Sequence, residues 1–448
     1  FKQKTAYEIR LSLVGSEMCI RDRLYPESNH PDGSPDLAYS LNNLGFVLNA
    51  QGAYERARPY LDQALAMRRK LYPEAKFPDG HPELAMSLIN LGLLHKDQES
   101  HDQARSYFEQ ALAMQRKLYP TSKHPDGHPE LAISLNNLGS LLEDHGDFAE
   151  ALPHLEHALA MRRKLYPETN YPDGHPELAT SLNNLGCLFE DKGDYNEAKP
   201  HLEQALAMLR RLYTETKYPD GHPYLAYCLN NLGSLLELQG EYAEAKTCYE
   251  QALAMRRKLY PESKFPGGHP DLARSLHSLG FLQARGSYEE ARPYLQQALT
   301  MRRKLYPTAS YPDGHPELAQ SLDSLGLLFQ AQGANEPARA HFEEALAMKR
   351  KIIQQMLQLA SESEALAQVQ AQTLMRDAYL SVTAPISDST GAAYRAVWDS
   401  KAAVAQIAEL RHAIALAAGA KAADQFARLQ EVRRRIDQLR HETRINAE

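Results

Sequence analysis

Apolar and polar residues follow a pattern that predicts two amphipathic helices joined by a turn. Within residues 128–167, Leu131, Leu135, Leu138 and Leu142 recur at the three- and four-residue spacing of one helix face. A Gly-Asp pair interrupts this stripe. The apolar positions after it predict the packing face of a second helix; they are Phe148, Ala151, Leu155 and Ala158. The chain carries this unit seven times, so we expect an all-α protein.

A proline at the start of each first helix marks the length of the unit. Successive prolines are 47 residues apart five times and then 46 residues apart. They are Pro35, Pro82, Pro129, Pro176, Pro223, Pro270 and Pro316. Units of this period bury their apolar faces against their neighbours, and the pattern therefore predicts a helical solenoid.

Each unit also carries start and stop signals for its helices. In the third unit, His128 follows an Asp-Gly turn and takes the N-cap position, and Pro129 stands where a missing N–H costs nothing. The second helix is expected to continue to Tyr166, because Pro167 cannot extend it. We therefore expect two helices and an ordered linker in every unit.

The unit resembles the tetratricopeptide repeat (TPR). The motif is Leu135-x2-Leu138-Gly139-x2-Leu142, then Ala151-x3-Leu155, then Ala158. Its Gly and Ala positions recur as Gly45/Ala57/Ala64, Gly92/Ala104/Ala111, Gly186/Ala198/Ala205, Gly233/Ala245/Ala252, Gly280/Ala291/Ala298 and Gly326/Ala338/Ala345. The long second helix and the HPxxA start are similar to those of kinesin light chains and of bacterial repeat proteins. The resemblance implies a right-handed TPR superhelical solenoid, here with a C-terminal helical extension.

The same pattern divides the chain into four segments. Residues 1–23 share nothing with the repeats and resemble adaptor read-through, so we expect a non-native leader. Residues 24–33 match the linker after every second helix and are interpreted as the tail of a lost upstream repeat. Residues 34–351 hold the seven repeats, and residues 352–448 are predicted to form a helical cap and connector.

Two repeats depart from the others, and we expect local irregularity in both. In the second repeat, Glu99 and Ser100 replace the Gly turn, and His95 takes a position in the core stripe. In the sixth repeat, one residue is lost before Gly286, and Gln283 replaces an apolar residue.

The C-terminal segment has two features of interest. Ile352, Met356 and Leu359 form a stripe that is expected to cover the end of the last repeat. Residues 374–382 (LMRDAYLSV) and 392–406 (AAYRAVWDSKAAVAQ) resemble the connector between the repeats and the caspase-like domain of bacterial CHAT-domain proteins. This resemblance implies that a catalytic domain would follow, so the chain itself is not expected to be an enzyme.

Composition narrows the function classes. A net charge of −7 gives no general attraction to polyanions. The four cysteines have no paired short spacing, which argues against a disulfide framework or a zinc site and favours a cytoplasmic protein; they are Cys19, Cys187, Cys228 and Cys248. No apolar run is long enough to span a bilayer. No catalytic residue, cofactor or metal is predicted.

Side chains opposite the leucine stripe vary from repeat to repeat, and we predict that they line a peptide-binding groove. The variable positions are Tyr39, Met86, Ile133, Thr180, Tyr227, Arg274 and Gln320, and then Phe46, Leu93, Ser140, Cys187, Ser234, Phe281 and Leu327. A polar ladder runs between them: Asn43, Asn90, Asn137, Asn184 and Asn231, then Ser278 and Ser324. The Asn amides can bond a bound peptide, as the resemblance to kinesin light chains implies, or they can bond the neighbouring helix.

Two further sets of residues each allow more than one interpretation. A basic run ends each second helix, as in Arg68-Arg69-Lys70, Arg162-Arg163-Lys164, Arg256-Arg257-Lys258 and Arg302-Arg303-Lys304. These runs either form a ridge that contacts nucleic acid or stabilise helix ends and pair with residues such as Glu156 and Glu203. The His-Pro histidines could suggest a metal site, but their separation by whole repeats favours helix capping.

We therefore expect a scaffold that captures a protein or peptide without chemistry of its own. The CHAT resemblance implies the sensor or regulatory part of a TPR-CHAT protease-like protein of bacterial origin. A stand-alone adaptor similar to kinesin light chain and a nucleic-acid-binding solenoid are the alternatives. No membrane partner is expected.

Overall fold

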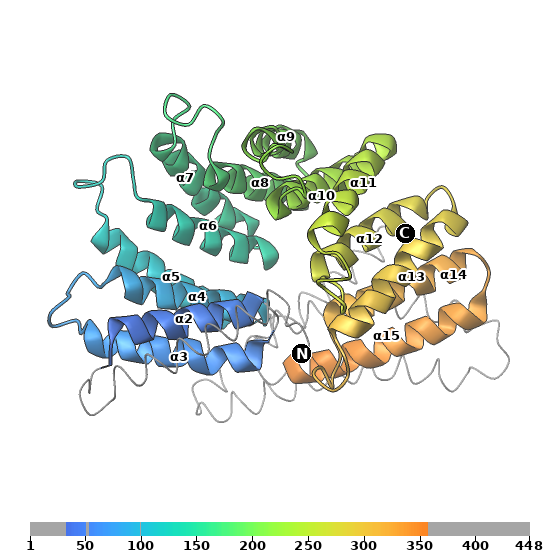
Figure 1. Ribbon diagram of the computed structural model, residues 1–448, viewed down its shortest axis with the longest axis horizontal. Helices are drawn as coiled ribbons and strands as arrows, with labels where there is room; N and C mark the ends of the chain where they lie inside the picture. Colours follow the sequence, from blue (N-terminus) through green and yellow to red (C-terminus); the bar gives the residue numbers. More distant parts are fainter. Residues whose placement is uncertain (1–32, 51–52, 99, 357–448) are drawn as a thin grey trace, which may run out of the picture. The chain divides into compact units, whose positions relative to one another are not determined.

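The computed structural model describes residues 33–50, 53–98 and 100–356, and every regular element within them is an α-helix (Figure 1). The first helices of the repeats are α2 (Pro35–Ala50), α4 (Pro82–Asp97), α6 (Pro129–Asp144), α8 (Pro176–Asp191), α10 (Pro223–Leu238), α12 (Pro270–Gln283) and α14 (Pro316–Ala331). The second helices are α3 (Tyr54–Leu71), α5 (His101–Leu118), α7 (Phe148–Leu165), α9 (Tyr195–Leu212), α11 (Tyr242–Leu259), α13 (Tyr288–Leu305) and α15 (Asn335–Met356).

The helices form the all-α solenoid that the sequence predicts. The chain divides into two compact units, residues 1–305 with helices α2–α13 and residues 306–448 with α14 and α15. In the first unit, each first helix packs against the second helix of its own repeat, and each second helix packs against the next first helix. In the second unit, α14 packs against α15.

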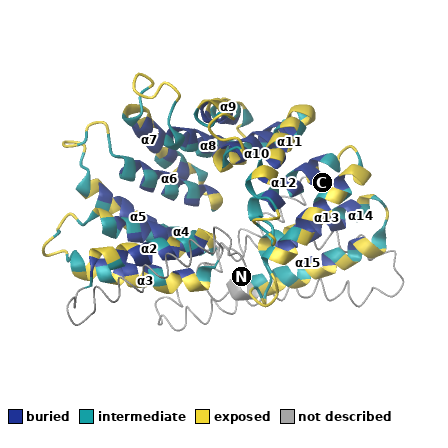
Figure 2. Ribbon diagram, in the orientation of Figure 1, coloured by how far each residue is buried: buried dark blue, intermediate teal, exposed yellow. Residues whose placement is uncertain are grey.

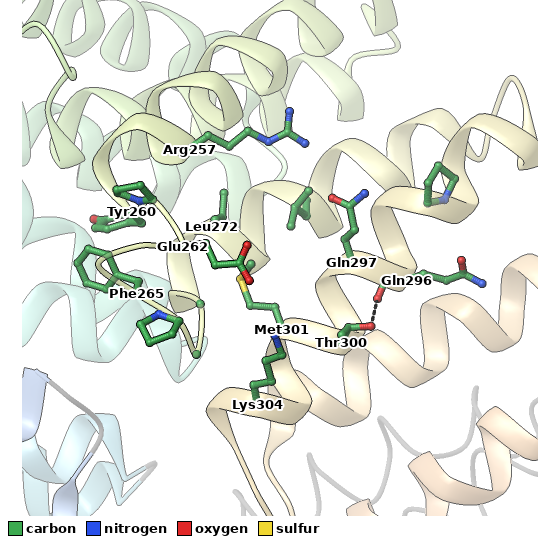
Figure 3. Close-up of a pocket in the computed structure, with 16 residues that line it drawn as sticks. Arg257, Tyr260, Glu262, Phe265, Leu272, Gln296, Gln297, Thr300, Met301 and Lys304 are labelled. Carbon is green, nitrogen blue, oxygen red and sulfur yellow. Dashed lines mark hydrogen bonds between the residues drawn. The ribbon is translucent and has the colours of Figure 1, made fainter. Parts of the chain in front are cut away.

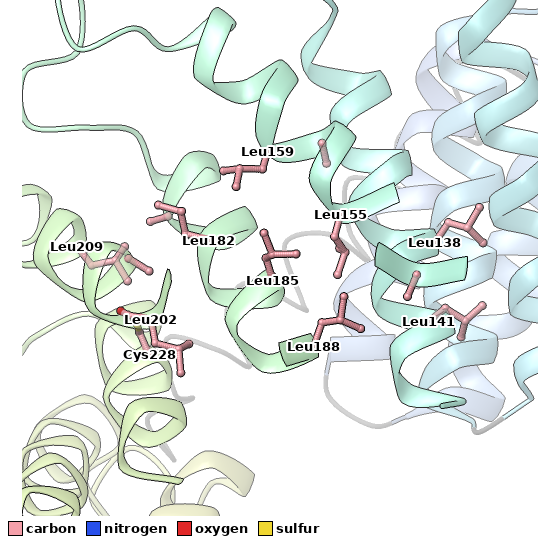
Figure 4. Close-up of a cluster of buried hydrophobic side chains, with 14 of the residues drawn as sticks. Leu138, Leu141, Leu155, Leu159, Leu182, Leu185, Leu188, Leu202, Leu209 and Cys228 are labelled. Atoms are coloured by element: carbon pink, nitrogen blue, oxygen red, sulfur yellow. Dashed lines mark hydrogen bonds between the residues drawn. The ribbon is translucent and has the colours of Figure 1, made fainter. Parts of the chain in front are cut away.

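The predicted leucine stripe and alanine face form the core. Leu131, Leu135, Leu138 and Leu142 are all buried, and Ala151, Leu155 and Ala158 are completely buried, whereas Phe148 is only partly covered. In the first unit the buried side chains make one continuous cluster from repeat to repeat. Figure 2 marks the buried residues along the helices, and Figure 4 draws a part of this cluster. Each buried leucine contributes about 1.5–3 kcal/mol, so the repeats depend on their neighbours for stability.

The linkers are ordered by a recurring aromatic cluster. In the third linker, the ring of Tyr166 stacks on His175 with centroids 3.6 Å apart, and Tyr171 meets both rings edge-on. His175 Nδ1 accepts a hydrogen bond from the Glu177 backbone N–H at 3.2 Å. The same stack and cap recur at His81, His128, His222, His269 and His315. The predicted capping role of the His-Pro histidines is therefore confirmed.

The helix boundaries match most of the expected signals. Helix α7 ends at Leu165, and Tyr166 is its C-cap, directly before Pro167. In the sixth repeat, α12 has 14 residues where the other first helices have 16, as the lost residue predicts. In the second repeat, His95 is buried in the core stripe, while α4 and α5 keep the usual lengths.

Several sequence predictions concern residues outside the described ranges. They are the leader at residues 1–23, nearly all of the upstream linker at 24–33, Glu99, Leu359 and the connector from residue 357 onward. At the other border, Ile352 and Met356 belong to the end of α15, which continues past the last basic run.

Candidate functional site

The predicted groove residues lie on one face of the first helices, which we call the first-helix face. They occupy the fifth, ninth and twelfth positions of α2, α4, α6, α8 and α10, and the fifth and twelfth of α12. Their side chains are half-buried or exposed, except for Asn90, which is buried. Neighbouring first helices contact one another at α2/α4, α6/α8, α8/α10 and α10/α12. This arrangement places equivalent residues of successive repeats next to each other.

Polar contacts connect this face across repeats three to five. Asn184 Nδ2 donates to Ser140 Oγ at 3.1 Å, and Asn231 Nδ2 donates to Asn183 Oδ1 at 3.1 Å. The Asn231 amide also lies 3.3 Å from Cys187 Sγ. Asn184 and Asn231 therefore bond the preceding first helix, which is the structural alternative left open above. Their role in binding a peptide stays a prediction.

Exposed aromatic rings occupy the two ends of the first-helix face. Tyr39 and Phe46 on α2 are 55% and 47% exposed, and Tyr227 on α10 and Phe281 on α12 are 39% and 43% exposed. A large apolar ring gains little from facing water, and such rings are enriched where proteins bind one another. These four residues are the apolar contact points that the face offers.

Of the two interpretations of the basic runs, the ridge does not include the first arginine of each run, because this side chain is buried. Arg162 Nη1 donates to the carbonyl oxygen of Glu177 at 2.9 Å and to Ser181 Oγ at 2.6 Å, both in the next repeat. Arg68 and Arg256 make the same two bonds with their own next repeats. We call this arrangement the arginine lock. The pairing expected with Glu156 is also replaced, since the lock reaches forward to the following first helix.

Family profiles identify the repeats. Two profiles, both described as tetratricopeptide repeat, match residues 36–117 and 169–211, and residues 131–177, 225–271, 272–317 and 318–354. Together they cover about two thirds of the chain. The chain belongs to the tetratricopeptide-repeat family. The first part of the resemblance drawn from the sequence is therefore confirmed.

Several solved structures are similar to this tetratricopeptide-repeat chain. BtubC (BKLC) from P. vanneervenii is 21% identical with a TM-score of 0.43, over 57% of this chain and 93% of that one. A Podosopora anserina kinesin light chain candidate with nearly identical TPR-like repeats is 24% identical with a TM-score of 0.39, over 50% and 97%. The apo form of RapI is 18% identical with a TM-score of 0.45, over 69% and 98%.

No curated protein matches the chain. Among the helices of the described residues, none combines the length and apolar character needed to cross a membrane.

The described cysteines of the tetratricopeptide repeats are packing residues. Cys228 is buried, and burial raises the pKa of its thiol to about 12. Burial also raises the pKa of Cys187 and Cys248, with the nearby Glu143 carboxyl adding to the effect at Cys187. A nucleophilic cysteine needs a lowered pKa, so the geometry favours the packing interpretation. Within the part of the chain that the structure describes, no cluster of His, Cys, Asp or Glu could hold a metal ion.

The repeats also form pockets that the sequence did not indicate. One of about 510 Å³ lies between the linker after α11 and helix α13 (Figure 3). Tyr260 and Phe265 line one side, and Gln297, Met301 and Lys304 line the other. An equivalent pocket of about 410 Å³ lies between the linker after α9 and helix α11. Each pocket brings together residues of a linker and of the next second helix, which lie apart along the chain.

Proposed function

We propose that the chain is a scaffold that binds a protein or peptide noncovalently on its first-helix face. Membership of the tetratricopeptide-repeat family supports a scaffold of this kind, since stacked repeats create extended binding surfaces. The observation that carries the proposal is the exposure of Tyr39, Phe46, Tyr227 and Phe281 at positions that vary between repeats. The scaffold is proposed to act in the cytoplasm.

Selection of peptides from a random twelve-residue library tests this proposal. We expect selected peptides to lose at least about tenfold in affinity for the Tyr227→Ser variant, because a buried aromatic contact at an interface contributes about 2 kcal/mol. Tyr288→Ser is the matched control, since Tyr288 is equally exposed but begins a second helix. Equal losses in both variants, or no enriched peptide, would contradict the proposal.

A finer proposal concerns the longer protein. The resemblance of residues 374–382 and 392–406 to the CHAT connector supports a sensor part whose ligand binding controls a caspase-like domain. Reading the source DNA beyond residue 448 tests it. A following domain with a His–Cys pair supports control of a protease, whereas an immediate stop codon supports a stand-alone adaptor.

The nucleic-acid alternative can be tested by salt dependence. Burial of Arg68, Arg162, Arg256 and Arg302 removes one cation per run from the proposed ridge. We therefore expect at most weak binding of double-stranded DNA or RNA. Tight binding that weakens steeply between 50 and 200 mM salt, as for a protein that neutralises many phosphates, would favour the alternative over peptide binding.

A further inference from the structure

Carboxyl groups gather at the C-terminal ends of α6, α8 and α10. Glu143, Glu190 and Glu237 occupy equivalent positions there, and Asp144 and Asp191 follow the first two. A helix C-terminus carries a partial negative charge, which disfavours a carboxylate and favours a cation. None of these three helices has a basic residue in its last turn. Carboxylates at these helix C-termini therefore lower the stability of the protein when no ligand is bound.

These carboxyls differ in the number of hydrogen bonds that neighbouring groups donate to them. Glu237 accepts from Arg285 Nε and from Tyr249 Oη, both at 3.2 Å. Glu190 accepts one bond from Ser234 Oγ at 2.6 Å. Glu143 is only 8% exposed, and among the described residues no hydrogen bond or close ion pair to its carboxyl is found.

The surroundings of Glu143 are acidic and enclosed. The nearest cation is Lys96, but its Nζ lies 2.7 Å from the carboxylate of Asp144. Burial, together with the charges of Asp144 and Asp191, raises the pKa of Glu143 to about 8, and burial raises the pKa of Glu190 to about 7. Glu143 is therefore mostly protonated at pH 7, and a nearby cation would favour loss of this proton.

A second unmatched group lies on the same helix face, two turns before Glu143. Asn136 is 6% exposed, and its Oδ1 atom has no hydrogen-bond partner. In the next repeat, the equivalent Asn183 Oδ1 accepts from Asn231. Asn184, which would be the equivalent donor for Asn136, bonds Ser140 instead. Helix α6 thus carries two largely buried polar groups without a hydrogen-bond partner among the described residues, Asn136 Oδ1 and the Glu143 carboxyl.

Helix α8 contacts both α6 and α10 around this site. Burial raises the pKa of Cys187 on α8 and of Tyr227 on α10, and the charge of Glu143 on α6 adds to both shifts. Tyr227 adds an exposed aromatic ring, and a Lys or Arg side chain over such a ring gains about 0.5–2 kcal/mol. The site offers acceptors, negative charge and an aromatic ring together.

We propose that the first-helix face over α6, α8 and α10 binds a basic segment of a partner protein, and that Glu143 receives a Lys or Arg side chain from it. The proposal rests on the peptide-binding function proposed above and names the chemistry of the ligand. A guanidinium or ammonium group supplies the donor that the Glu143 carboxyl lacks, and its charge suits the helix ends.

Labelled peptides test the proposal by fluorescence anisotropy. The probes are twelve-residue Gly-Ser peptides that carry four Arg, four Gln or four Glu residues at the same positions. We expect the Arg peptide to bind at least about tenfold more tightly than the Gln peptide, and the Glu peptide not to bind. Glu143→Gln should weaken binding of the Arg peptide about tenfold, because it removes the charge that pairs with a guanidinium.

A matched control separates the site from general electrostatic attraction. Glu156→Gln makes the same charge change at an exposed position on the second helix α7, and should leave the affinity unchanged. The Glu143→Gln protein should also have a higher thermal midpoint than the parent, since it removes an uncompensated buried carboxyl. Loss of binding with gain of stability excludes misfolding as the cause.

The pH dependence supplies an independent readout. Affinity for the Arg peptide should rise from pH 6.5 to 8.5 as Glu143 and Glu190 ionise, and the rise should be smaller in Glu143→Gln. The other charged or titratable groups that face the site are Lys96 on α4, Asp144 on α6, Cys187 and Asp191 on α8, and Tyr227 on α10.

The outcomes distinguish this proposal from the general one. Equal weakening by Glu143→Gln and Glu156→Gln overturns the assigned site. Preferential binding of the Gln or Glu peptide, lost in Tyr227→Ser, overturns the basic ligand but keeps the peptide-binding function. If no peptide of any charge binds, both proposals fail.

Discussion

The arginine lock shows how single residues set the contact between repeats. At the junctions of repeats one and two, three and four, and five and six, a buried arginine reaches a serine of the next repeat. The equivalent positions at the junction of repeats two and three hold Gln115 and Ser134, whose buried side-chain oxygens have no partner. Between repeats four and five they hold the apolar pair Leu209 and Cys228. One junction thus keeps the serine without the arginine, and another replaces both residues by an apolar pair.

This pairing predicts the behaviour of variants at Arg162. Arg162→Leu should lower the free energy of unfolding by about 3 kcal/mol, because it leaves Ser181 and the Glu177 carbonyl without a donor. Adding Ser181→Cys copies the natural apolar pair and should restore more than half of that loss. Urea unfolding followed by circular dichroism measures both. Additive losses in the double variant would show that the two positions do not act together.

The histidine caps give the protein a defined pH dependence. Burial lowers the pKa of His175 and of the equivalent His81, His128, His222 and His269. Only the neutral form of the ring can accept the backbone N–H of the cap. The unfolded pKa is about 6.5. The stabilisation is therefore complete above this value and is lost as the pH falls through the lowered folded pKa.

Replacement of one cap isolates this contribution. Asn is a strong N-cap that does not titrate near neutral pH, so His175→Asn should lose less stability between pH 7 and pH 5 than the parent, by about 1 kcal/mol. His157→Asn, at an exposed site on α7, is the control. Because Glu143 and Glu190 act with the opposite sign, only the difference between variant and parent is diagnostic. If the stability difference between variant and parent is the same at pH 5 and pH 7, the cap mechanism is contradicted.

At the scale of helices and linkers, a glycine in each linker packs closely against the next second helix. Gly221 has φ near +87°, and a Cβ there would lie 2.2 Å from Met255 Cγ on α11. Gly240 also has a positive φ but faces open space. A substitution at Gly240 therefore tests the cost of backbone strain alone, whereas one at Gly221 tests the cost of strain and close packing together.

Alanine substitutions test this separation. Gly240→Ala should cost about 1–2 kcal/mol from backbone strain alone, and Gly221→Ala about 3 kcal/mol, because Met255 must also move. Thermal unfolding of the two variants measures the difference. Equal decreases in the thermal midpoint of the two variants would indicate that Met255 moves without a loss of stability.

The sequence predicts elements better than it predicts their surfaces. His128, Pro129 and Pro167 act through local backbone chemistry, so they set the limits of α6 and α7 correctly. The burial of Arg162 depends on a serine 19 residues later in another repeat, and composition places such a residue outside. The lack of a partner for Glu143 likewise depends on how three helices pack. In the sequence, it is indicated only by a carboxylate in a last helical turn that has no basic residue.

At the scale of the whole array, each repeat of the first unit is stabilised mainly by its neighbours. Leu182 on α8 is buried within the continuous core, and Leu182→Ala should cost about 2–5 kcal/mol. In a nearest-neighbour array this loss affects nearby repeats most. Hydrogen exchange should therefore quicken in α8 and α9 more than in α2 and α3. Glu203→Ala, at an exposed site on α9, is the control, and a uniform change across all helices would show a single cooperative unit.

The alternation of the arginine lock has a mechanical consequence. A guanidinium that must reach a carbonyl and a hydroxyl at once allows one angle between two repeats, whereas Leu209 and Cys228 require only close contact. The lock therefore fixes the angle within the repeat pairs one and two, three and four, and five and six. The junction of repeats four and five is held instead by the bonds from Asn231 to Asn183 and from Ser234 to Glu190. A ligand that lies along several first helices would therefore meet a fixed angle at each locked junction, and any change of angle would have to occur at the junctions without a lock.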